Sequence, residues 1–376
     1  MAKADGKKKK LPNIIEATAD YEKWLGRHVT IVRPDLALKH QHMAEAAFPF
    51  FRATFYRWAQ LWPVVCEEVS KAPPVLAVGD LHVENFGTWR DIEGRLIWGI
   101  NDFDEAWPAA YTVDLVRLTT SAFLAIDAEH LCVTRREARE AIEQGYRDAI
   151  AKGGAPFVLA EQHRWLRLLA LSKLRDPIQF WTKIESCPRT MEKPPKAVLS
   201  LLHSSLPLRK PKYETKRRIA GLGSLGHPRI LALSEWHGAH LVREAKELRP
   251  SAWVWAEKKK DGKLLNEKLI NTALRVTDPH VHFRGSWQVR RLGPDCCHIE
   301  LASLPEEHDE AKLLYAMGWE TANIHLGSTK AIPVLKRDLG KRKGKWLQKA
   351  AKAMSEATLE DWKEWQRKGK RDGKNA

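Results

Sequence analysis

The sequence predicts an α+β protein of two lobes, with a helical lobe first and a sheet-rich lobe second. Up to about residue 205, apolar residues recur mainly at helical spacing, as they do over residues 41–70. After Pro207 and Pro211 the chain changes to alternating, strand-like segments. The 376 residues are 44% hydrophobic and 29% charged, which is ordinary for a globular protein with two or three packed units.

The first lobe is expected to span residues 13–205, after a basic disordered tail at residues 1–12. Its expected helices are residues 13–26, 41–70 (as one helix or two), 113–126, 134–152 and 156–174, and its expected strands are residues 75–78 and 95–100.

The sheet-rich lobe is expected to span residues 206–303, followed by C-terminal helices and a basic tail at residues 304–376. Its expected strands are residues 217–220, 229–233, 240–245, 287–292 and 298–302, with a helix at about 264–274; the C-terminal helices are expected at 310–326 and 342–366.

The net charge of +16 favours anionic partners such as nucleotides, nucleic acid or acidic lipid. Much of the excess lies in residues 7–10 and 341–374, which we interpret as solvated, disordered tails. Nucleic-acid binding through these tails stays open but is not favoured, because the sequence has no aromatic-basic platform and no zinc-finger spacing.

Cysteine usage and the lack of long apolar segments indicate a cytoplasmic protein. The five cysteines include no CxxC pair and their number is odd, which suits a reducing compartment. No apolar signal-peptide core follows the basic N-terminus, and no stretch approaches the ~20 apolar residues that span a membrane.

Two polar motifs follow the two adjacent strands expected in the first lobe. Asp80 comes after the strand at 75–78, and Asn85 lies five residues later, which is the spacing of a phosphotransferase catalytic loop. In such a loop the Asp meets the acceptor hydroxyl and the Asn amide oxygen reaches a metal on the phosphates. Asp102 and Asp104 follow the strand at 95–100, and hard cations such as Mg²⁺ take oxygen ligands. The sequence therefore predicts Asp80 as the catalytic residue and Asn85, Asp102 and Asp104 as magnesium ligands, the alternative being acids that merely favour exposed turns.

These motifs resemble a known group of enzymes. The segment from Gly79 to Asn85 resembles the catalytic loop of the aminoglycoside phosphotransferase and choline kinase group within the protein-kinase-like fold, and residues 101–106 resemble its metal loop. With residues 111–118 added, the chain is closer still to the bacterial family of domain of unknown function 2252 (DUF2252), over about residues 45–326.

The resemblance implies that Asp80 is a catalytic base and that Asn85 and Asp102 bind metal. It also implies that Asp114 is a buried acid bracing the catalytic loop. One position departs from the phosphotransferase group, since Val78 stands where that group usually has a histidine.

A glycine-rich segment in the second lobe adds a nucleotide-binding element. Residues 221–226 read Gly-Leu-Gly-Ser-Leu-Gly and lie between two strand-like segments rather than before a helix. That context favours a kinase hairpin that covers phosphates over a dinucleotide fold, and an ordinary hairpin is the alternative. Its expected cofactor-binding residues are Gly221, Gly223, Ser224 and Gly226.

A cation for the phosphates is expected on the third strand, where kinases place a lysine. The related family has Val-Lys-Glu-Ala there, so Arg243 occupies the matching place, and Lys246 is the rival. Arg and Lys do not substitute freely for one another at such sites.

The glycine loop follows the catalytic loop, whereas in ordinary kinases it precedes it. We therefore predict a circularly permuted, protein-kinase-like fold, with the helical catalytic lobe first and the nucleotide-binding sheet lobe second. The helix at 311–325 would take the place that normally leads into the catalytic loop.

The sequence thus predicts an ATP- and Mg²⁺-dependent phosphotransferase acting on an unidentified hydroxyl-bearing acceptor, either a small molecule or a protein. Two alternatives stay open. One is a metal-dependent phosphoesterase, and the other is a non-catalytic, kinase-like module that only binds nucleotide.

Overall fold

The computed structural model describes residues 11–160, 162–170, 176–190, 193–207, 209–296 and 309–372. The strand expected at 298–302 and most of the N-terminal tail expected at 1–12 lie outside these residues.

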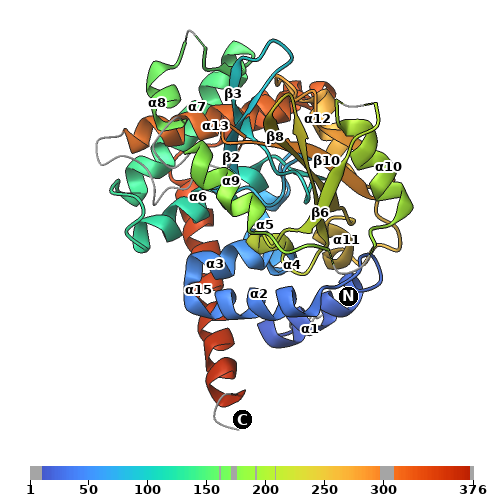
Figure 1. The fold of residues 1–376 in the computed structure, drawn as a ribbon. Helices are drawn as coiled ribbons and strands as arrows, with labels where there is room; N and C mark the ends of the chain where they lie inside the picture. Colours follow the sequence, from blue (N-terminus) through green and yellow to red (C-terminus); the bar gives the residue numbers. More distant parts are fainter. Residues whose placement is uncertain are drawn as a thin grey trace.

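The first part of the chain is mostly helical and carries two small antiparallel sheets (Figure 1). Its helices are α1 (Ile14–Leu25), α2 (Arg33–Glu45), α3 (Ala47–Ala53), α4 (Phe55–Val65), α5 (Glu67–Ser70), α6 (Thr112–Asp127), α7 (Arg135–Lys152) and α8 (Arg164–Ala170). Strand β1 (Pro74–Ala77) pairs with β4 (Trp107–Ala110), and β3 (Leu96–Ile100) lies between β2 (Phe86–Arg90) and β5 (Phe157–Val158).

Three expectations for this part need correction. The segment 41–70 is not one or two helices, because it contains the end of α2 and then α3, α4 and α5. The segment 156–174 begins with β5 before α8. The strands before the two polar motifs, β1 and β3, do not pair with each other and belong to different sheets.

The second part is built on a five-stranded antiparallel sheet in the order β6-β7-β8-β10-β9. Its strands are β6 (Tyr213–Arg217), β7 (Arg229–Trp236), β8 (Ala239–Glu247), β9 (His282–Arg284) and β10 (Trp287–Leu292), and its connections contain α11 (Ala252–Ala256) and α12 (Asn266–Thr272). The first strand ends at Arg217, where the sequence pattern predicted that it begins.

Two helices that the sequence analysis did not predict cover the two faces of this sheet. Helix α10 (Lys196–Ser205) packs Val198 and Leu202 on the face that contains Ala245 of β8. Helix α9 (Pro177–Glu185) packs Ile184 on the opposite face, which contains Val242. The sheet therefore follows the alternation of side chains that a strand imposes, and each face has its own apolar cluster.

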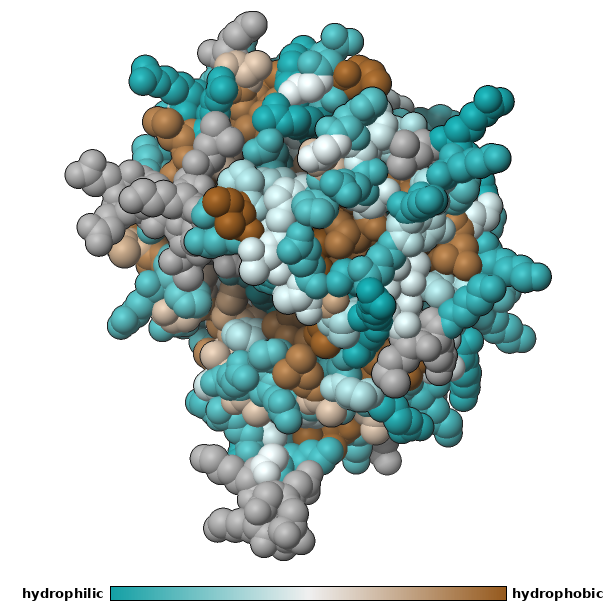
Figure 2. Space-filling model, viewed as in Figure 1, coloured by the Kyte–Doolittle hydropathy of each residue, from teal (hydrophilic) through white to brown (hydrophobic). Residues whose placement is uncertain are grey.

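The chain then returns to the helical part through α13 (Glu310–Leu326), α14 (Ile332–Lys341) and α15 (Trp346–Asp372). Helix α13 packs along α7, and α15 packs on α6 and α4. The helix expected at 342–366 is present but runs from Trp346 to Asp372, so most of the segment that we interpreted as a disordered tail is helical. Leu347, Ala351 and Met354 recur at helical spacing and are fully buried. No helix among the described residues is long and apolar enough to cross a bilayer. The face seen in Figure 2 is mostly hydrophilic, with apolar residues in small separate patches.

The buried acid Glu320 links α13 to the sheet of the first part. Its Oε1 accepts the Ile100 N–H at 3.4 Å and its Oε2 accepts the Asn323 amide at 2.7 Å. Burial raises the pKa of Glu320 to about 7, and the charge of Arg275 opposes that rise. Because the folded pKa lies above the unfolded value, this group favours folding at low pH and loses that contribution as pH rises toward 7.

We therefore expect Glu320 to lower the free energy of unfolding by about 3 kcal/mol between roughly pH 4.5 and 7. Glu320→Gln removes the titration, so the variant should lose that part of the pH slope in urea denaturation. Glu360→Gln, at an exposed position of α15, is the control and should keep the wild-type slope. Equal slopes in Glu320→Gln and the wild type would contradict the assignment.

Candidate functional site

A cavity of about 790 Å³ lies between the helical part and the five-stranded sheet. Its walls come from α3, from the loops after β1 and β3, from α9, and from the sheet with the loop between β6 and β7. Seven of the predicted site residues line it: Asp80, Asn85, Asp102, Asp104, Gly221, Gly223 and Ser224. Folding thus brings the two acidic loops and the glycine loop together.

The carboxylate of Asp80 uses one oxygen for an internal partner and turns the other toward the cavity. Its Oδ1 accepts from Arg117, with Nε at 2.8 Å, and the fully buried Arg117 also lies over the Phe51 ring at 4.0 Å. A Cβ placed on Gly223 would lie 3.6 Å from Asp80 Oδ2. Burial raises the pKa of Asp80 to about 6, against the effect of Arg117. A carboxylate with a pKa close to neutral is suited to accept a proton from an acceptor hydroxyl.

Asp114 of α6 holds the backbone of the loop that carries Asp80. The buried Asp114 carboxylate accepts the N–H groups of Val78 and Gly79 at 2.7 and 2.8 Å. His325 of α13 lies 2.9 Å from the same carboxylate. Asp114 is therefore the buried bracing acid that the resemblance implied.

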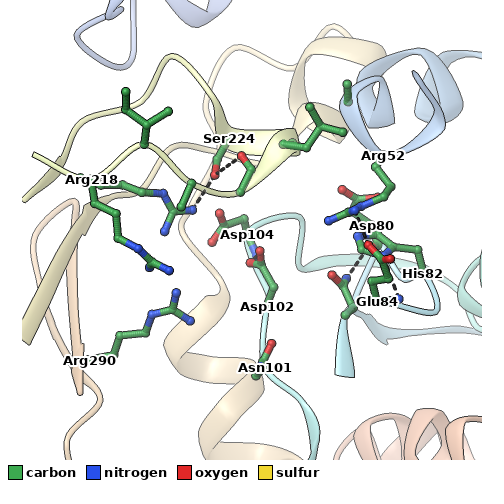
Figure 3. A pocket seen from close by; sticks show the side chains of 18 of the residues that line it. Arg52, Asp80, His82, Glu84, Asn101, Asp102, Asp104, Arg218, Ser224 and Arg290 are labelled. Atoms are coloured by element: carbon green, nitrogen blue, oxygen red, sulfur yellow. Dashed lines mark hydrogen bonds and ion pairs between the residues drawn. The ribbon is translucent and has the colours of Figure 1, made fainter. Parts of the chain in front are cut away.

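Asn85 and Asp102 are neighbours because β2 pairs with β3. That pairing lets the Asn101 N–H donate to the Asn85 carbonyl at 3.1 Å and so joins the two loops. The Asn85 side-chain amide donates to the Asp80 carbonyl, so its remaining polar atom is the amide oxygen. Figure 3 shows Asn101, Asp102 and Asp104 along one wall of the cavity, with Asp80 and Glu84 on another.

These oxygens fit a magnesium site completed by phosphate and water. Mg²⁺ is usually held by one or two protein carboxylates together with substrate phosphates. The described residues contain no cluster of three or more His, Cys, Asp or Glu side chains suited to hold a metal. The buried Asn101 Oδ1 has no hydrogen-bond partner in the described part of the chain and adds an oxygen beside Asp102.

Glu105, the acid that follows Asp104, has a structural role instead. Glu105 forms an ion pair with Arg249 and accepts from the Ser251 hydroxyl and the Ala252 N–H at 2.8 and 2.6 Å. It thereby binds the start of α11 to the metal loop.

The glycine loop closes over Asp80 as a short 3₁₀ turn rather than as an open hairpin. The turn spans Leu222–Ser224 and follows Gly221, whose φ of +78° favours glycine. Lys39 of α2 donates to the Gly223 carbonyl at 3.0 Å, which ties the loop to the helical part. Gly226 lies at the far end of the loop, where its carbonyl accepts the Val32 N–H, and it does not line the cavity.

Of the two predicted cations, only Lys246 faces the acids. Its Nζ lies 3.4 Å from Asp102 Oδ1 and forms an ion pair with Asp104. Arg243 is three residues earlier on β8 and therefore points to the opposite face, where its Nε donates to the Ser205 carbonyl at 3.0 Å. The assignment of Arg243 to the phosphates is incompatible with this geometry.

Sequence reasoning missed the three arginines on the sheet side of the cavity. Arg218, Arg229 and Arg290 line it from the sheet side, around the buried Glu244. Arg52 lines the opposite side and pairs with Glu84. The alternation of side chains along β8 is the one sequence signal that could have pointed to this cluster. It places Glu244, which the three arginines surround, on the same face of the sheet as Lys246.

Comparison with known proteins bears on the acidic loops. No curated protein and no solved structure matches the chain. Residues 32–175 match a family described as "Uncharacterized protein conserved in bacteria (DUF2252)". The match includes Asp80, Asn85, Asp102 and Asp114 and ends before the glycine loop. It therefore supports the resemblance to DUF2252 in the segment that carries both acidic loops.

Proposed function

We propose that the protein is an ATP- and Mg²⁺-dependent phosphotransferase that acts on a hydroxyl-bearing acceptor. The observation that carries this proposal is the shared cavity, in which Asp80, Asn85 and Asp102 meet a glycine loop from a distant part of the chain. Phosphoryl transfer depends mostly on positioning and charge, so one cavity must hold a base, metal ligands and phosphate-binding groups.

Each group has a role that follows from its surroundings. Asp80 orients the acceptor hydroxyl and takes its proton on Oδ2, while Arg117 fixes the other oxygen. Asn85 and Asp102 would hold Mg²⁺, which neutralises charge on the phosphates when bound. Lys246 lies beside Asp102 and Asp104 and would supply a positive charge near the phosphates.

The order of the elements supports a permuted, kinase-like arrangement. The glycine loop joins β6 to β7, and Lys246 lies on the next strand, β8, which corresponds to the third-strand lysine of protein kinases. The end of α13 lies against the strand before the catalytic loop, because Leu76 N–H donates to Ser328 Oγ at 2.8 Å. This contact fits the proposal that α13 takes the place that leads into the catalytic loop.

One observation favours a non-catalytic nucleotide-binding module as the second candidate. Lys246 pairs with both Asp102 and Asp104, so one of their two negative charges is already balanced without a metal. Nucleotide binding that neither needs Mg²⁺ nor leads to ADP formation would favour this candidate.

The first test is the melting temperature with ATP, with and without Mg²⁺. A ligand at 100 times its Kd stabilises a protein by about 2.7 kcal/mol, which corresponds to a rise of several degrees. We expect a Mg²⁺-dependent rise in the wild type that is lost in Asp102→Asn. The control is Asp127→Asn, at the end of α6, where the acid pairs with the exposed Arg135. A rise of equal size with and without Mg²⁺, or one retained in Asp102→Asn, would contradict the assigned metal site.

A further inference from the structure

Three arginines on the cavity side of the sheet share one buried acid. Glu244 of β8 is fully buried and pairs with Arg218, Arg229 and Arg290, at 2.7, 3.2 and 2.8 Å. Burial opposes ionisation of Glu244, but the three arginines together hold its pKa well below the ordinary value. The cluster therefore contains three positive charges and one negative charge.

The arginines differ in how they meet the cavity. Arg229 is buried and also donates to Ser224 Oγ at 2.6 Å, so it links Glu244 to the glycine loop. Arg218 uses Nη1 for Glu244 and Arg290 uses Nε, and both side chains line the cavity. Figure 3 shows Arg218 and Arg290 reaching into the cavity from the sheet side, facing Asp102 and Asp104.

This geometry suits a polyphosphate. A guanidinium held through one edge keeps other N–H groups for a second anion, and paired donors match phosphate oxygens. Asp102 and Asp104, across the cavity, would repel an anion on their own, and Lys246 offsets only one of their two negative charges, so Mg²⁺ would have to offset the other. The arginines and the acids therefore define two sides of a channel in which a phosphate chain lies between cations.

The apolar residues of the same sheet face pack against α9. Leu231, Val242 and Leu292 pack against Ile184 of α9, and Leu231 and Val242 are fully buried. Ile184 and Leu292 also line the cavity, so its sheet side presents an apolar edge beside the arginine cluster.

We propose that Arg218 and Arg290 form the binding subsite for the polyphosphate group of the phosphoryl donor. This inference rests on the proposed function for the identity of the donor, but the subsite itself requires only a polyphosphate ligand.

The test measures binding of inorganic tripolyphosphate and of ATP, each with Mg²⁺, by isothermal titration calorimetry. Charge-assisted hydrogen bonds are the strong ones, so Arg218→Gln and Arg290→Gln should each weaken tripolyphosphate binding about tenfold or more. The matched control is Arg284→Gln on β9 of the same sheet, an exposed arginine that bonds Ser200 outside the cavity. It should change the Kd less than about twofold.

Wild-type protein gives an independent measurement if a variant folds poorly. Tripolyphosphate should protect Arg218 and Arg290 from an arginine-modifying reagent, with Arg284 still modified, as mapped by mass spectrometry.

The outcomes separate this inference from the proposed function. Tripolyphosphate binding that is lost in the two cavity variants supports the subsite, and if ATP binds with Mg²⁺ but yields no ADP with any acceptor, the phosphotransferase proposal fails alone. Mg²⁺-dependent ATP binding that is unchanged in both variants would overturn the subsite and leave the proposed function standing. Failure of the wild type to bind either ligand would overturn the subsite as well.

Discussion

Asp80→Asn is expected to lower ADP formation from ATP by 10²–10⁴-fold, with either water or an added alcohol as acceptor. That range is typical for the loss of a positioned general base. Asn keeps an oxygen for Arg117 but cannot take a proton on the atom that faces Gly223. The measurement is initial-rate ADP release at saturating Mg²⁺ and ATP.

The same variant should still bind nucleotide, because Asp80 is assigned to the acceptor and not to the donor phosphates. The Mg²⁺-dependent rise in melting temperature should therefore stay close to that of the wild type. Asp127→Asn, the same chemical change on the protein surface, should leave both readouts unchanged. If Asp80→Asn turned over ATP at the wild-type rate, another residue would have to be the base.

The acidic loops were predictable because their chemistry is local. The spacing from Asp80 to Asn85 lies within one short loop, and no long-range contact is needed to present both side chains. The proximity of this loop to Asp102 could not be predicted from the local sequence. It depends on the β2–β3 pairing, and β2 escaped notice because Phe86–Arg90 has no clear apolar alternation and is almost entirely buried.

The cationic side of the cavity was largely unpredictable because it is built across strands. Glu244 of β8 lies directly opposite Arg290 of β10 on one side and directly opposite Leu231 of β7 on the other. No local sequence pattern specifies these strand registers. The choice between Arg243 and Lys246 is different. The sequence from Val242 to Lys246 places the even-numbered residues on one face, so parity alone favours Lys246 beside Glu244 over Arg243.

The two helices that flank the sheet, α9 and α10, were missed for a related reason. Each is short and has few buried residues of its own, and each helix gains its stability from the sheet face that it covers. Helix α13 was predicted with the correct ends, Glu310–Leu326, because it is long and starts at the capping residue Asp309.

Asp114→Ala is expected to destabilise the protein by about 3–5 kcal/mol, the largest stability effect that we assign to a single side chain. The substitution leaves the N–H groups of Val78 and Gly79 buried without their acceptor, and it also removes one of the two partners of His325, the other being the Tyr146 hydroxyl. Each unsatisfied buried group costs about 1–3 kcal/mol, and losing one partner of a buried polar pair is costly in its own right. Urea denaturation followed by circular dichroism measures the change.

The matched control is Asp127→Ala, at the last position of the same helix α6, where the acid pairs with an exposed arginine. It should cost less than about 1 kcal/mol, because surface ion pairs contribute little. If Asp114 acts as the brace of the catalytic loop, the folded fraction of Asp114→Ala should also turn over ATP more slowly than its loss of stability explains. Equal destabilisation by the two substitutions would mean that α6 holds the loop through packing alone, and Asp114 would lose its role as the link between the helical core and the position of Asp80.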